Sequence, residues 1–162
     1  MSLTIRKATK RDSKAILELV VGLANFERLE PPDGKAKRRI LRDAFETKRI
    51  SILVATLDRA HAGYALYFYT YSSFLARQTL YLEDIFVYEK FRGRGVGEAL
   101  FRACAEEAAR HRCGRMEWSV LTWNESAMGF YERLGARRLK EWYVYRLDSD
   151  ALSRLNRKVQ LS

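Results

Sequence analysis

The chain has 162 residues, of which 48% are apolar and 12% aromatic, with only 9 Gly, 2 Pro and 2 Cys. This length suits one domain with a sizeable core, expected over residues 1–162, and the composition argues against disorder. No apolar run approaches the roughly 18 residues of a membrane span, and the first residues lack the apolar core of a secretory signal. With too few cysteines for a disulfide scaffold and no metal-ligand spacing, we expect a cytoplasmic protein without a metal site.

The charge is strongly basic. Thirty Lys and Arg against twenty Asp and Glu give a formal net charge of +10. Such a field attracts anions, for example nucleic acid, a membrane surface or a phosphorylated cofactor. A solvated basic surface without a partner accounts for the charge equally well, so charge alone names no ligand.

Periodicity of the apolar residues predicts the elements in chain order. A short strand over Leu3 to Ala8 precedes a helix that Thr9 or Asp12 caps and that runs to about Phe26. The later expected elements, with a basic helix first, are a helix over 35–46, strands over 50–57, 61–71 and 79–87, a helix over 97–111, a strand over 116–121, a helix over 125–134, a strand over 142–147 and a short helix beyond Asp148. This order predicts an α/β or α+β fold with one mixed sheet covered by helices.

The most informative stretch joins an expected strand to an expected helix. It combines arginines with glycines at alternate positions: Arg92, Gly93, Arg94, Gly95 and Gly97. Glycines permit backbone conformations that a Cβ forbids, so their N–H groups can converge on a pyrophosphate ahead of a helix, with arginine as a charged donor. The spacing is neither Gly-x-Gly-x-x-Gly nor a Walker loop, since Glu98 follows Gly97. A merely flexible turn is the remaining interpretation.

These residues resemble a known family. The sequence Arg92-Gly93-Arg94-Gly95-Val96-Gly97 matches the Arg/Gln-x-x-Gly-x-Gly/Ala signature of the GNAT acetyltransferases, which cradles the coenzyme A pyrophosphate. Segments 81–87, 123–126 and 130–136 resemble the diamine (spermidine/spermine) N1-acetyltransferase branch, and 67–71 and 24–27 do so more loosely. The resemblance implies a GNAT fold, with a mixed, mostly antiparallel sheet of six to seven strands flanked by about four helices.

The resemblance also implies acetyl-CoA as cosubstrate. In the family, the strand before the turn carries a bulge and splays from its neighbour, which frees backbone groups of Phe86 and Val87 for the pantetheine arm. The residues expected to contact the cosubstrate are Ile85, Phe86, Val87, Arg92, Gly93, Arg94, Gly95, Val96, Gly97, Glu98, Asn124 and Tyr131.

Glu83 and Asp84 lie near the end of an apolar strand. Adjacent strand residues point to opposite faces, so one carboxylate is expected on the packed side, where an unpaired charge is costly. A structural pair bridged to nearby arginines is one interpretation. The resemblance implies another, in which Glu83 is a water-linked base and Asp84 binds the substrate ammonium. A base is useful because an alkylamine with a pKa of about 10.4 is almost wholly protonated at neutral pH.

Tyr131 follows Asn124 by seven residues, close to two helical turns, so both side chains share one side of a helix. A tyrosine inside an amphipathic helix most often packs in a core. The resemblance instead implies that Tyr131 protonates the leaving thiolate and that Asn124 contacts the coenzyme. Direct attack of the amine, without a covalent enzyme intermediate, is then expected.

The expected function is therefore acetyl-CoA-dependent N-acetylation of a primary amine of a small di- or polyamine. The residues expected to bind it are Glu27, Glu83, Asp84 and Glu141. A chain with a net charge of +10 repels a polycation at long range unless its acidic residues cluster at the site. A lysine-like amino acid, which carries a carboxylate, is therefore the alternative acceptor. A nucleic-acid-binding domain is the hypothesis from another class, although we find no aromatic-flanked basic platform. The aromatic stretch 142–145 suggests a homodimer contact.

Overall fold

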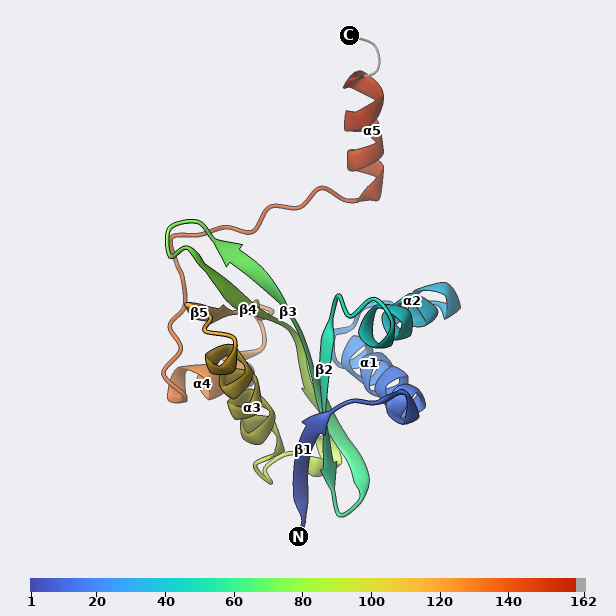
Figure 1. Cartoon of the computed structure of the whole chain (residues 1–162), viewed down its shortest axis with the longest axis vertical. Coiled ribbons are helices and arrows are strands. Elements are labelled where there is room, and N and C mark those ends of the chain that lie inside the picture. Colours follow the sequence, from blue (N-terminus) through green and yellow to red (C-terminus); the bar gives the residue numbers. More distant parts are fainter. Residues whose placement is uncertain (160–162) are drawn as a thin grey trace. The chain divides into compact units, whose positions relative to one another are not determined.

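The computed structural model describes residues 1–159 and has a central sheet with helices on both faces (Figure 1). Its elements, in chain order, are β1 (Leu3–Lys7), η1 (Lys10–Asp12), α1 (Ser13–Glu27), α2 (Gly34–Phe45), β2 (Ser51–Leu57), β3 (Ala60–Ser72), β4 (Arg77–Val87), η2 (Glu89–Phe91), α3 (Val96–Arg110), β5 (Arg115–Glu117), α4 (Glu125–Arg133) and α5 (Ser149–Val159). They form two compact units, one of Met1–Leu121 and a second that begins at Thr122. Across the described residues, no helix is both long and apolar enough to cross a membrane.

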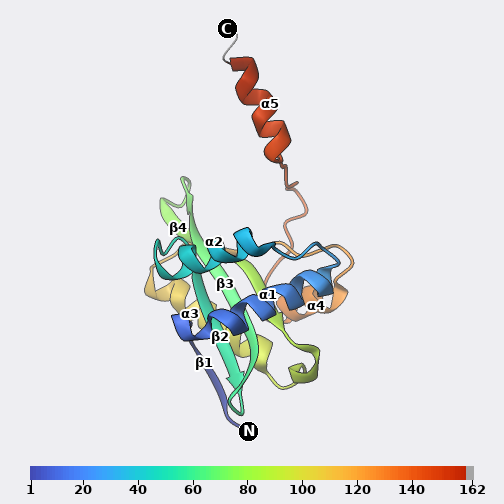
Figure 2. The same cartoon turned by 90° about the vertical axis from the view of Figure 1, so that its right-hand side faces the viewer.

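The sheet has the strand order β1-β2-β3-β4-β5. The first three pairings are antiparallel, and β4 pairs with β5 in parallel. Helices α1 and α2 cover one face, and α3 covers the other (Figures 1 and 2). The expected α/β class and the mixed, mostly antiparallel sheet are thus confirmed.

The expected strand count is wrong, because the sheet that the described residues form has five strands rather than six or seven. The strand expected over 116–121 is reduced to Arg115–Glu117, and residues 142–147 form no strand in the described part of the chain. The aromatic side chains of this second segment are largely exposed, from 71% for Trp142 to 92% for Tyr145. Aromatic and β-branched residues are typical of strands, but a strand also needs a neighbouring strand that pairs with its backbone groups.

Two apolar cores lie on the two faces of the sheet. One contains Leu100 and Cys104 of α3 packed on Leu80 and Leu82 of β4. The other contains Ile16 and Leu19 of α1 packed on β2, β3 and β4. Burying a large aliphatic side chain contributes roughly 1.5–3 kcal/mol, so each amphipathic helix is held mainly by such residues.

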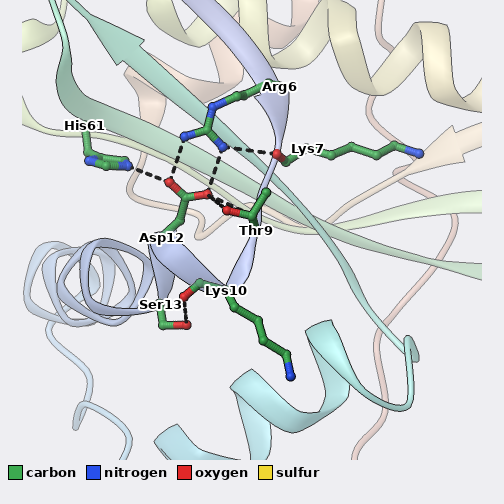
Figure 3. A network of polar contacts seen from close by, with 7 residues as sticks. All are labelled: Arg6, Lys7, Thr9, Lys10, Asp12, Ser13 and His61. Atoms are coloured by element: carbon green, nitrogen blue, oxygen red, sulfur yellow. Dashed lines mark hydrogen bonds and ion pairs between the residues drawn. The ribbon is translucent and has the colours of Figure 1, made fainter.

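A buried carboxylate joins the first strand, the first helix and β3 (Figure 3). Asp12 is 3% exposed, and both of its oxygens accept from the Arg6 guanidinium at 2.8 Å. Its Oδ2 also accepts from the Thr9 backbone N–H at 2.8 Å, and its Oδ1 lies 3.0 Å from His61 Nε2. The hydrogen bonds from Arg6 hold the pKa of Asp12 far below its usual range. The network therefore fixes where α1 begins against the sheet.

Replacing this carboxylate should destabilise the fold. We expect Asp12→Asn to lower the free energy of unfolding by about 2–4 kcal/mol. An amide has one acceptor oxygen, so it cannot accept both donors of Arg6, and the Arg6 guanidinium loses its carboxylate partner. Because the folded-state pKa is depressed, the loss should be constant from about pH 5 to 8 and shrink as the pH falls below about 4. Urea denaturation measures it.

Glu132→Gln is the matched control, since Glu132 pairs with Arg138 at 3.1 Å on the surface, where such pairs contribute little. An equal loss in both variants would contradict a special role for the Asp12 network.

Candidate functional site

Strand β4 carries one extra residue opposite β3. Leu66 of β3 pairs with Asp84, whereas the next residue of β3, Tyr67, pairs with Leu82. Glu83 therefore has no register partner and forms a β-bulge. Because side chains alternate with a period of two, one inserted residue moves all later side chains of the strand to the opposite face.

The packing of β4 follows this shift. Before the bulge, Leu82 packs in the core on the α3 side. After it, Phe86, another even-numbered residue, packs in the core on the α1 side, while Ile85 and Val87 contact the α3 side. Asp84 shares the parity of Phe86 and so belongs to the α1 face.

Both carboxylates of the doublet lie on the α1 face. Asp84 Oδ2 accepts a 2.8 Å hydrogen bond from the hydroxyl of Tyr64, a fully buried residue of the α1-side core. Glu83 is exposed and interacts electrostatically with both Asp84 and Glu27 of α1. Asp84 is thus the one carboxylate on the packed side, as expected, but the bulge rather than regular alternation places it there.

We call Glu27, Glu83 and Asp84 the acidic cluster. Burial, together with the charges of Glu83 and Glu27, raises the pKa of Asp84 to about 6, although the hydrogen bond from Tyr64 opposes the rise. Burial and the charge of Glu83 also raise the pKa of Glu27. Each acid disfavours the ionised form of its neighbours, so a bound cation would relieve the repulsion.

Aromatic side chains lie on the same face of the sheet, just before the bulge. Tyr81, two residues before Glu83, lies opposite Phe68 of β3, with ring centroids 5.3 Å apart. The Tyr81 hydroxyl lies 3.3 Å from the Ser119 hydroxyl. An apolar chain that carries an amine could therefore pack against these rings and place its amine at the acidic cluster.

On its other edge β4 separates from β5. The parallel pairing covers three residues and ends at Tyr81, opposite Glu117, although β4 continues to Val87. Residues 82–87 therefore have an edge that β5 does not pair. This is the splay that the family resemblance implies.

The backbone groups at this edge can be identified. The Phe86 carbonyl lies only 2.4 Å from where a Cβ of Gly63 would stand, so it faces β3, and only glycine allows this approach. Backbone groups of successive strand residues point to opposite edges. Ile85 and Val87 thus direct theirs to the unpaired edge, and Phe86 does not.

Two glycines of the turn need their special conformation. Gly93 and Gly95 have φ of +70° and +77°, and no atom lies within 4 Å of the Cβ that either would carry. Gly95 is the N-cap of α3 and supplies no capping side chain. Gly97 lies within α3 and adopts helical geometry, so two of the three alternating glycines shape the turn. The positive end of α3 thus opens on a surface that anions favour.

The charged residues of the turn differ in their contacts and exposure. Arg92 Nε donates to the Val87 carbonyl at 3.0 Å, and its guanidinium lies 4.7 Å from the Phe26 ring centroid. Arg94 is exposed. Glu98 forms an ion pair with Arg102 at 2.7 Å on the first turns of α3. Arg92 therefore fastens the turn to β4 and α1.

The remaining expected residues belong to the second unit. Asn124 Oδ1 accepts from the Ala127 N–H at 3.2 Å and so caps α4. Tyr131 is half-buried on α4, with its ring centroid 5.3 Å from that of Phe130. Glu141 lies 3.9 Å from Arg137. Within the first unit, the structure brings together Glu27, Glu83 and Asp84.

Sequence reasoning missed Tyr64. In the sequence it is one of several aromatics in an alternating strand, and nothing marks it as the partner of a carboxylate. The bulge was expected only from the family resemblance, and the face of the sheet to which Asp84 points depends on the pairing with β3.

Comparison with known proteins identifies relatives among acetyltransferases. Residues 16–136 match the profile of the Acetyltransferase (GNAT) family. The thialysine N-epsilon-acetyltransferase of Bos taurus is 34% identical over 93% of this chain and 95% of its own length. The L-ornithine N5-acetyltransferase NATA1 of Arabidopsis thaliana is 46% identical over 62% of this chain, a match that spans 44% of the relative's length.

A more distant relative and a solved structure extend the comparison. The spermine/spermidine N(1)-acetyltransferase of Bacillus subtilis is 25% identical over 83% of this chain and 88% of its own length. The crystal structure of a probable acetyltransferase superposes with a TM-score of 0.79 at 24% identity, covering 90% of this chain and 97% of the other. At that identity the likeness shows the fold alone.

The acidic cluster can be tested by its mutual repulsion. We expect Glu27→Gln to lower the pKa of Asp84 from about 6, because it removes a like charge. The measurement is a carboxyl-carbon NMR titration. Glu18→Gln, an exposed position on the same helix, should leave that pKa unchanged. An unaltered titration in Glu27→Gln would show that the two carboxylates are not coupled.

Proposed function

The chain belongs to the GNAT acetyltransferase family, and we propose that it acetylates the primary amine of a small molecule, with the side-chain amine of a lysine-like amino acid favoured. The observation that carries the proposal is the acidic cluster on the α1 face, next to a splayed strand and a glycine turn of the family's type. Every part of this site in the first unit comes from residues 27–98.

The residues at the turn fit acetyl-CoA, which supplies the acetyl group as a thioester. The space beside Gly93 and Gly95 is open, and the N-terminus of α3 has no side-chain cap. Backbone N–H groups can therefore approach a pyrophosphate. We assign the diphosphate to the turn and the pantetheine arm to the edge of β4. The residues proposed to hold the cosubstrate are Ile85, Val87, Arg92, Gly93, Arg94, Gly95, Val96, Gly97, Glu98, Asn124 and Tyr131. Phe86, expected among them, is left out, because its carbonyl faces β3 and its side chain packs in the α1-side core.

The acidic cluster serves the acceptor amine. Asp84 and Glu27 are the proposed partners of its ammonium, since both are partly desolvated and gain most from a cation. Glu83 is the exposed member and is proposed to receive the surplus proton through water. Glu141 is proposed to bind a distal part of the acceptor.

The proposed reaction is direct. The amine nitrogen forms a bond to the thioester carbonyl carbon, and the carbon–sulfur bond breaks. The bound ammonium first loses one proton through water to Glu83, and the neutral amine then attacks. As the amide forms, the nitrogen loses its second proton to water, and the leaving sulfur takes a proton from the Tyr131 hydroxyl. Water returns a proton to Tyr131, so that one proton is released overall. Neither cysteine of the chain takes part: Cys104 is buried, and burial raises the pKa of its thiol to about 12.

Two observations favour a lysine-like amino acid over a polyamine. Its carboxylate suits a chain with a net charge of +10, whereas a polycation is repelled at long range. The relatives of 34% and 46% identity are named for thialysine and ornithine, and those named for spermidine or spermine are less similar. The acidic cluster itself favours a di- or polyamine, which remains the second candidate. Neither the fold nor the family favours nucleic acid.

We also propose a homodimer. Trp142, Tyr143, Val144 and Tyr145 are 71–92% exposed, and a second copy would remove this apolar surface from water. Sedimentation equilibrium measures the mass in solution, and a monomer at all concentrations would contradict the dimer.

The function is tested by free-thiol release from acetyl-CoA with a panel of thialysine, lysine, ornithine, putrescine and spermidine. We expect turnover with the amino acids first and with the diamine second. No release with any amine, although acetyl-CoA binds, would overturn the proposed acceptor class. Gly95→Val should abolish binding of acetyl-CoA, because a branched side chain at φ +77° strains the turn and fills the open space.

Gly135→Val is the matched control for strain. Gly135 has φ +93°, with no atom near its Cβ position, but lies after α4 outside the proposed site. It should retain affinity for acetyl-CoA in calorimetric titration.

The acid role of Tyr131 predicts a specific kinetic loss. We expect Tyr131→Phe to lower kcat by roughly 10²–10⁴-fold with little change in the Kd of acetyl-CoA, since only the proton donor is removed. Tyr71→Phe, at an exposed tyrosine outside the proposed site and the proposed dimer contact, is the control. Unchanged kcat in Tyr131→Phe would exclude this residue as the acid.

A further inference from the structure

The hydroxyl of Tyr64 is fixed on one target. Tyr64 is fully buried between β3 and α1, and its hydroxyl donates to Oδ2 of Asp84 at 2.8 Å. A buried hydroxyl is costly unless it is hydrogen-bonded, so phenylalanine would suit an apolar core better if the site required no donor. The bulge at Glu83 brings the acceptor to this side of the sheet.

We propose that Tyr64 is a positioning residue for amine recognition: by holding Oδ2 of Asp84, it keeps that carboxylate ionised and leaves Oδ1 to receive the substrate ammonium. The inference rests on the proposed function, because it assumes that Asp84 meets an ammonium. Tyr64 itself lies behind Asp84 in the core and acts through it.

The charges around Asp84 show why such a donor is needed. The negative charges of Glu83 on the same strand and Glu27 on α1 both act on Asp84, which is half-buried. The Arg92 guanidinium is held over the Phe26 ring and bonded to the Val87 carbonyl. Burial and the two acids raise the pKa of Asp84 to about 6, and the hydrogen bond from Tyr64 is the opposing influence.

Removing that donor should therefore neutralise Asp84 over more of the physiological range. A hydrogen bond to a charged group shifts a pKa by about one unit. If the pKa rises by about one unit from about 6, the ionised fraction at pH 6 falls roughly fivefold, while at pH 8.5 it hardly changes. A neutral carboxyl is a poor partner for an ammonium, so KM should follow the ionised fraction.

Tyr67 provides a matched control in the same strand. It is also buried, but it packs in the core on the α3 side, away from the acidic cluster. Tyr64→Phe and Tyr67→Phe each delete one buried hydroxyl from β3. A general loss of stability should appear in both variants, whereas an effect that acts through Asp84 should appear only in Tyr64→Phe.

The first measurement needs no substrate. A carboxyl-carbon NMR titration should show the pKa of Asp84 rising by about one unit in Tyr64→Phe and unchanged in Tyr67→Phe. An unaltered pKa in Tyr64→Phe, or an equal shift in both variants, overturns the proposal. The titration tests the role of Tyr64 even if the enzyme acetylates none of the amines. A lack of acetylation would count against the proposed function and not against the effect of Tyr64 on Asp84.

The second measurement compares steady-state kinetics with the best amine of the panel. In Tyr64→Phe, KM for the amine should rise about fivefold at pH 6 and approach the wild-type value at pH 8.5, with kcat nearly unchanged at both. With Asp84→Asn in the background, Tyr64→Phe should have no further effect on KM. A KM ratio independent of pH, or an additive effect in the double variant, overturns the proposal.

Discussion

The bulge at Glu83 is the constraint on which the site depends. A strand alternates its side chains with a period of two, so one unpaired residue transfers everything after it to the other face of the sheet. In a regular strand Asp84 would follow Leu82 into the apolar core against α3, as an unpaired charge. The bulge instead places it beside Tyr64, with a hydrogen-bond donor and two acidic neighbours.

The end of β4 and the turn after it form the part of the site that we propose for the cosubstrate. After Tyr81 strand β4 leaves β5, and Ile85 and Val87 direct their backbone groups to the edge that opens. The chain then turns through Gly93 and Gly95 into α3, whose N-terminus favours anions. The turn and the acidic cluster thus present opposite electrostatic environments. This separation of charge is what would allow a strongly basic protein of the GNAT family to bind the proposed ammonium.

Sequence reasoning succeeded where the signal is local. The helices follow from apolar periodicity, and α1, α3 and α4 lie within a residue or two of their expected bounds. The prediction of a strand over 142–147 is wrong because its aromatic and β-branched residues describe only side-chain preference, whereas a strand forms when another strand pairs with its backbone. Glu83 and Asp84 were expected through the family resemblance, and Glu27 as an acidic residue that could offset the net positive charge. Tyr64 was not, because its importance comes from a residue twenty positions away, on another strand.

The sequence by itself determined the class of fold, the family and the glycine turn. Those properties depend on residues that are neighbours in the chain, and glycine is the residue that readily adopts the φ found at Gly93 and Gly95. Only the tertiary structure decided that both carboxylates share the α1 face and that Arg92 binds the sheet. Such outcomes depend on strand register and on helix packing, which bring distant residues together and which no local pattern encodes.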